Sequence, residues 1–188
     1  MEHVKRAGAM RSLAAFVDSC DADIFCVHDI ESGDAFALAT RFAREWAYRG
    51  SQALFWNEHF SAEKIVDRYL PASPLRPFDR RGLLQVNGKC CDAALSVFAT
   101  QLADGRAQRA RELRFARTAL HASEMLAIAF AALPDRRFGL QGAGFQDVTP
   151  GEAQTLGCYV RGFVRGEARV VNDSRDIAEA MICEITRA

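Results

Sequence analysis

The stretch DADIFCVHDIESGDA, residues 21–35, joins a short apolar run to a polar turn. Residues 24–27 are all apolar, which is typical of a buried strand. The run stops at His28 and Asp29, and Glu31 follows closely. An imidazole and two carboxylates at a strand end are able to hold a divalent metal ion. They fit equally well an ordinary strand end before a helix, where negative charge is mildly favourable.

Helices are predicted on both sides of this strand. Residues 9–19 and 34–48 carry apolar side chains at three- and four-residue spacing, as amphipathic helices do. For the second helix we expect Ser32 or Asp34 at the N-cap and Gly50 just beyond the end.

The rest of the chain is predicted to be mostly strands around one further helix, at residues 106–122. Asn87-Gly88, between two apolar runs, predicts a tight hairpin turn, and the glycine-rich segment 139–151 is predicted to be a loop. Clustered strands with intervening helices favour two packed sheets over one parallel sheet, so we expect a single α/β (α+β) domain over residues 1–188. The predicted strands are residues 52–56, 63–71, 82–88, 92–102, 125–133, 158–164, 168–172 and 179–185.

Composition narrows the class of protein further. Acidic and basic residues balance at 24 each, so global charge gives no argument for nucleic-acid binding. All the basic residues except three lysines are arginine, which suits phosphate contacts and equally reflects coding bias in a GC-rich genome. The six cysteines form no C-x-x-C pair, and we expect no disulfide framework. No apolar run approaches the roughly 18 residues of a membrane span, and we expect a cytoplasmic protein.

The order of these segments resembles the endonuclease/exonuclease/phosphatase superfamily, which has the deoxyribonuclease-I-like fold. The segments that carry the resemblance are DADIFCVHDIES, GLLQVNG, ALSVFATQL with the arginine-rich helix after it, MLAIAFAALP and VVNDSRDIAEAMICEI. The resemblance implies a four-layer sandwich of two mixed β-sheets with helices outside. The family's N-terminal strand has no counterpart here, so we expect one sheet edge to be open.

Most signature residues of that family are replaced. Its metal-binding Gln-Glu pair corresponds to His28-Asp29, and its Thr-His-Leu corresponds to Thr100-Gln101-Leu102. Asp29 keeps a carboxylate for a hard cation, whereas the amide of Gln101 hydrogen-bonds but cannot act as an acid or base. The Gly-Asp-Phe-Asn marker falls on the frame Ala129-Phe130-Ala131, where both polar side chains become methyl groups. The resemblance implies that Ala129 and Ala131 are neighbours of Asp29 in the fold. The Ser-Asp-His marker corresponds to Ser174-Arg175-Asp176.

Three functional hypotheses follow from the resemblance. The first is a catalytically degenerate member of the superfamily, kept as a binding or structural module. The second is an active magnesium-dependent phosphodiesterase or nuclease with a rearranged site around Asp29. The third is an interaction domain without phosphate chemistry that self-associates through its open sheet edge. We expect no cofactor, with Mg²⁺ as the alternative, and the partner class that fits is a phosphate-containing ligand or nucleic acid. The candidate site residues are Asp29 and Glu31 for the metal, Gln101 and Asp176 for catalysis, and Arg109 and Arg175 for phosphate, with Asp173 as a further oxygen donor.

Overall fold

The computed structural model describes residues 2–20, 22–74, 81–123, 126–132, 140, 143–149, 155–163, 165–170 and 181–186. In chain order the elements are α1 (Glu2–Ser19), β1 (Ile24–His28), α2 (Ser32–Phe42), β2 (Glu45–Arg49), β3 (Gln52–Trp56), β4 (Phe60–Tyr69), β5 (Gly82–Cys90), β6 (Ala93–Gln101), α3 (Arg106–His121), β7 (Leu126–Ala132), β8 (Gln146–Asp147), β9 (Leu156–Arg161), β10 (Arg165–Val170) and β11 (Met181–Thr186). No helix among the described residues is both long and apolar enough to cross a membrane.

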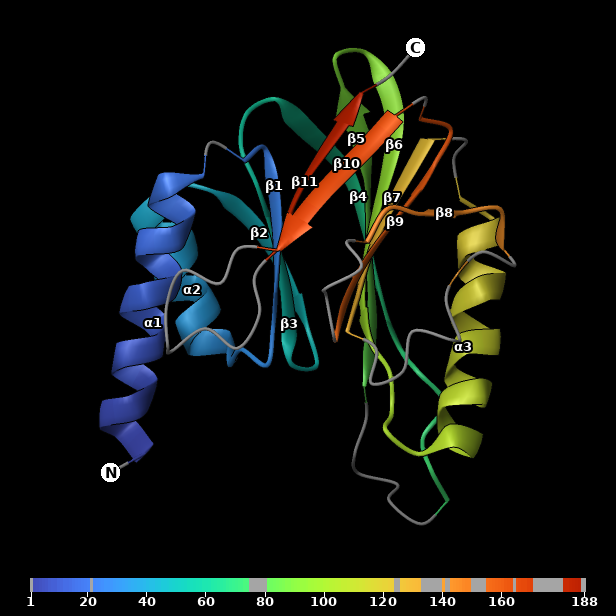
Figure 1. Cartoon of the computed structure of the whole chain (residues 1–188), viewed down its shortest axis with the longest axis horizontal. Coiled ribbons are helices and arrows are strands. Elements are labelled where there is room, and N and C mark those ends of the chain that lie inside the picture. The colour runs from blue at the N-terminus through green and yellow to red at the C-terminus, as the bar shows by residue number, and fades with distance from the viewer. Residues whose placement is uncertain are drawn as a thin grey trace.

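The elements stack in the order helices, sheet, sheet, helix (Figure 1). A three-stranded antiparallel sheet, β1-β3-β2, has α1 and α2 on its outer face, and a six-stranded sheet, β4-β5-β6-β7-β9-β8, has α3 on its outer face (Figure 1). Strands β10 and β11 pair separately. The predicted α+β sandwich of two packed sheets flanked by helices is therefore confirmed.

Three apolar clusters hold these layers together. One lies between the two sheets and includes Leu54, Val86 and Val97. The second joins α1 and α2 to the smaller sheet, and the third joins α3 to the larger sheet. Strands β6 and β7 contribute to two clusters and are buried on both faces, which explains why their sequences are nearly continuous apolar runs rather than alternating ones.

The helix predicted over residues 34–48 is wrong at both ends. Its N-cap is Glu31, whose side chain makes no capping hydrogen bond, and the helix ends at Phe42 because Ala43 adopts a left-handed backbone with φ 49°. The residues after it form β2, whose Trp46 lies 6.5 Å from the ring of Phe55, centroid to centroid. The helical spacing of Trp46 is overridden by pairing of β2 with β3, and Gly50 is part of their turn rather than the helix end.

The hairpin predicted at Asn87-Gly88 is also wrong. Both residues lie inside β5, where Asn87 pairs with Ser96 of β6 and accepts a 2.8 Å hydrogen bond from its hydroxyl. Gly88 serves close approach rather than a turn, because a Cβ at this position would lie 2.2 Å from the carbonyl oxygen of Ser61 on β4. The turn that joins β5 to β6 is formed instead by Cys91 and Asp92.

Helix α3 is the crossover that lets β6 and β7 pair in parallel. The side chain of Arg161, on β9, closes its C-terminal end by donating to the carbonyl oxygens of Leu120 and Ser123 at 3.0 and 3.3 Å. Near its N-terminal end, Glu112 is only 2% exposed and accepts the backbone N–H of Ala103 at 2.7 Å. The contact between Glu112 and Ala103 holds the loop after β6, and so the end of β6 itself.

Replacing Glu112 should therefore destabilise the fold. In Glu112→Ala the buried N–H of Ala103 loses its acceptor. The amide of Gln108, which donates to Glu112 at 2.9 Å, keeps only the carbonyl oxygen of Pro71. We expect the free energy of unfolding in urea to fall by about 2 kcal/mol. Glu112→Gln keeps one acceptor oxygen, so its free energy of unfolding should fall clearly less. Equal losses in the two variants would contradict this role for the carboxylate.

Candidate functional site at one end of the sandwich

Asp29, Ser51 and Gln101 meet where β1 and β6 end. The amide nitrogen of Gln101 donates to Asp29 Oδ1 at 3.0 Å, and the hydroxyl of Ser51 donates to Gln101 Oε1 at 2.7 Å. The backbone N–H of Ile30 is held by the carbonyl of Ser51 at 3.1 Å. Two predicted site residues, 72 positions apart in the chain, are thus in direct contact.

The backbone at Asp29 is what directs its carboxylate to Gln101. Its φ is 55°, in the left-handed region that aspartate tolerates better than most residues because its short side chain hydrogen-bonds locally. This residue turns the chain from β1 into α2, while Ile30 just after it is buried against the helices. The left-handed turn therefore follows from the short connection between strand and helix.

Behind this exposed end, the buried Gln52 and the half-buried His28 face the space between the sheets. His28 pairs with Gln52 across β1 and β3, and Gln52 donates to the carbonyl oxygens of Gly82 and Ala99 at 2.7 and 3.0 Å. Among the described residues, neither His28 Nδ1 nor Gln52 Oε1 has a hydrogen-bond partner. Burial lowers the pKa of His28 to about 4, although the nearby Asp29 carboxylate opposes the shift. The imidazole is therefore neutral at pH 7.

The side chains of β7 that face this space differ from those expected. Ala129 and Ala131 pack in the cluster under α3, whereas Ile128 and Phe130 pack between the two sheets. The expectation that Ala129 and Ala131 lie beside Asp29 is therefore wrong, because they point to the opposite face of the sheet. The residue that pairs with Gln101 is Ala132. Phe130 and Ala132 offer no proton acceptor either, so the neighbouring strand β7 supplies no base at this end.

The other predicted site residues lie apart from this contact or outside the described residues. Glu31 is exposed at the N-cap of α2. Arg109 is 5% exposed, and its guanidinium donates to the carbonyl oxygens of Ala103 and Asp104 at 3.4 and 3.0 Å. Its role in binding phosphate stays a prediction. Asp173, Ser174, Arg175 and Asp176 fall outside the described residues, and their predicted roles stay open.

The described side chains around Asp29 offer few oxygen ligands for a divalent cation. One carboxylate oxygen of Asp29 accepts the amide N–H of Gln101. Within the part of the chain that the structure describes, no three His, Cys, Asp or Glu side chains come together as a metal-binding group. The predicted use of Asp29 and Glu31 as metal ligands gains no support from this arrangement.

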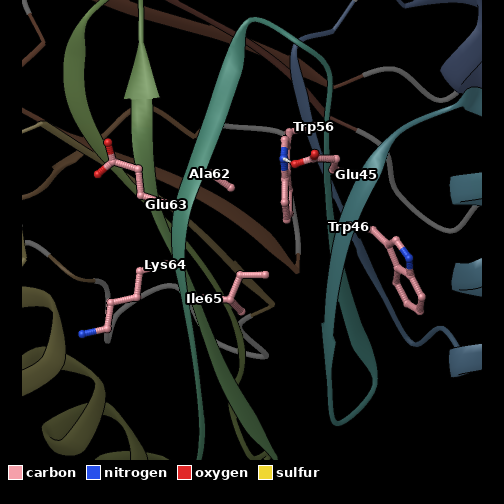
Figure 2. Close-up of a pocket in the computed structure, with 7 residues that line it drawn as sticks. All are labelled: Glu45, Trp46, Trp56, Ala62, Glu63, Lys64 and Ile65. Atoms are coloured by element: carbon pink, nitrogen blue, oxygen red, sulfur yellow. Dashed lines mark hydrogen bonds between the residues drawn. The ribbon is translucent and has the colours of Figure 1, made fainter.

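A separate hollow of about 460 Å³ lies between β2 and β4, which are edge strands of the two sheets. Figure 2 shows Ala62 and Ile65 pointing from β4 toward Trp56, while Glu63 and Lys64 point away from it. Glu45 accepts the indole N–H of Trp56 at 2.7 Å, and Glu63 pairs with Lys89 at 2.9 Å. None of the predicted site residues lines this hollow.

Comparisons with known proteins agree with the architecture. No family model and no curated protein sequence matches the chain. A mannosyl-6-phosphatase from Bacteroides thetaiotaomicron superposes with a TM-score of 0.75 at 12% identity, covering 96% of this chain and 91% of that one. Truncated TDP2 from Caenorhabditis elegans gives 0.73 at 15% identity, covering 94% and 88%. An endonuclease/exonuclease/phosphatase family protein from B. thetaiotaomicron gives 0.74 at 13% identity, covering 96% and 85%.

The neutral state of His28 predicts a specific dependence of stability on pH. The unfolded chain takes up a proton at this residue near pH 6.5, but the folded chain does so only near pH 4. The contribution of His28 to the free energy of unfolding is therefore fully present above pH 6.5. It is lost as pH falls toward 4, by up to about 3 kcal/mol. Urea unfolding of wild type and His28→Gln between pH 7.5 and pH 4 measures this. The difference in free energy of unfolding between the two proteins should change as pH falls from 6.5 to 4. A difference that stays constant would contradict a neutral imidazole at His28.

Proposed function

We propose that this chain, which has the endonuclease/exonuclease/phosphatase fold, is catalytically degenerate and acts as a binding or structural module. The observation that carries the proposal is the hydrogen bond between Gln101 and Asp29. It joins the two best-matched site positions to each other through an amide that cannot transfer a proton at neutral pH.

The chemistry of phosphodiester cleavage supports the same conclusion. In-line attack on phosphorus needs a metal ion or other cation against the developing charge, a base for the water and donors on the phosphate oxygens. The described site has the exposed carboxylate of Asp29, no described group of metal ligands, and Phe130 and Ala132 on the neighbouring strand β7. Losing a single such group costs about two decades of rate or more, so the combined loss should leave no measurable turnover.

A phosphate-bearing ligand is the first class that we propose for the module. One structural neighbour is a mannosyl-6-phosphatase, and the basic residues of this chain are nearly all arginine. Self-association is the second candidate, because β1 pairs with β3 alone among the described strands. An apolar strand with one unpaired side is a template for pairing with another chain.

The decisive measurement is hydrolysis of bis(4-nitrophenyl) phosphate and of plasmid DNA, with and without Mg²⁺, by wild type and Asp29→Ala. We expect neither protein to exceed the buffer blank. We also expect no change in the melting temperature of wild type on adding Mg²⁺. Metal-dependent turnover that disappears in Asp29→Ala would overturn the degenerate function and favour the active phosphodiesterase.

Two binding measurements separate the module's candidate roles. A phosphate ligand should raise the melting temperature as its concentration rises, because it binds only the folded chain. Self-association should instead appear as a concentration-dependent mass in light scattering. A monomer at all concentrations that no phosphate compound stabilises would count against both roles.

A further inference from the structure

Two adjacent cysteines form the tip of the hairpin between β5 and β6. Cys90 is the last residue of β5, Cys91 and Asp92 make the turn, and β6 begins at Ala93. The turn stands at the end of β6 opposite Gln101, so it is separate from the candidate site (Figure 1). Cys91 is exposed and Cys90 is partly exposed.

The backbone of this turn is unusual for its sequence. Cys91 and Asp92 have φ values of 49° and 65°, in the left-handed region. Hairpin turns of this kind strongly prefer glycine, asparagine or aspartate at these positions. Aspartate is an accepted choice at the second position, whereas a cysteine at the first carries steric strain. Such strain is commonly found at functional positions, which raises the question of what the thiol of Cys91 does.

The two thiols are neighbours in this turn. Burial first, then the neighbouring Cys91, raises the pKa of Cys90. Cys90 is therefore a protonated thiol at neutral pH. Reactions that need a thiolate, such as oxidation by peroxides, are slow at such a site. A reaction in which both thiols react and their protons leave in water does not need a thiolate at equilibrium.

We propose that the Cys90-Cys91 turn is a dithiol site for trivalent organic arsenicals. Two As–S bonds form as the As=O bond breaks, and the oxygen leaves with both thiol protons as one water molecule. Arsenic stays trivalent, so no oxidant or reductant is needed. The organic group occupies the third position on arsenic, so two adjacent thiols are sufficient. Cys158 cannot join them, because its side chain is fully buried, and Cys26 lies on β1 of the other sheet.

The test is titration of the reduced full-length chain with phenylarsine oxide, followed by intact-mass spectrometry. We expect one arsenical per chain with loss of one water. A dithiol such as 2,3-dimercaptopropanol should remove it, whereas 2-mercaptoethanol at the same thiol concentration should not. Cys90→Ser and Cys91→Ser should each bind about a hundredfold more weakly, because one thiol remains and the gain from two linked contacts is lost.

Three further variants keep the result decisive. Cys91→Gly suits the positive φ and should melt no lower than wild type while losing the arsenical. Cys20→Ser, which removes a thiol elsewhere, should bind as wild type does. Cys91→Ser/Asp92→Cys moves the second thiol by one residue and should bind weakly. An adduct that persists in Cys91→Gly, that maps to another cysteine, or that forms equally well in the double variant would overturn the proposal.

Discussion

The alternation of side chains along β6 and β7 determines what can reach the candidate site. Both strands are buried on two sides, by the other sheet and by α3, so every second residue belongs to a different cluster. A shift of one residue would exchange the two sets. Gln101 reaches Asp29 because it shares the inter-sheet face with Val97 and Ala99. Ala129 and Ala131 do not, because they share the other face with Phe98.

The same constraint gives the site its electrostatic character. At its outer edge an exposed carboxylate is bonded to an amide and, through that amide, to a hydroxyl. Further in, His28 and Gln52 lie side by side between the sheets, and burial keeps the imidazole neutral. These hydrogen bonds, one to a carboxylate and the others among neutral groups, tie the strands together.

The ends of the strands are held by different means. At the end of β6 that carries Gln101, the carboxylate of Glu112 fixes the following loop to α3. At the other end, a short turn with two left-handed residues closes the hairpin and leaves two thiols together. The first is a buried polar anchor that the fold needs. At the second, Cys90 packs partly against the core, whereas nothing in the packing requires a cysteine at the exposed position 91. That contrast is why the turn, rather than the loop, suggests a further binding site.

The sequence alone determined most of the secondary structure, because long apolar runs and helical spacing reflect burial directly. Strands such as Gln52–Trp56 and the helix Arg106–His121 lie close to where the pattern predicts them. Resemblance of motifs indicated the architecture and singled out Asp29 and Gln101. Only the tertiary structure decided that Trp46 belongs to a strand, since pairing with β3 outweighs local spacing. Register also lies beyond the sequence, because it is set by contacts between distant segments, and register decided that Phe130 and Ala132, not Ala129 and Ala131, face the site.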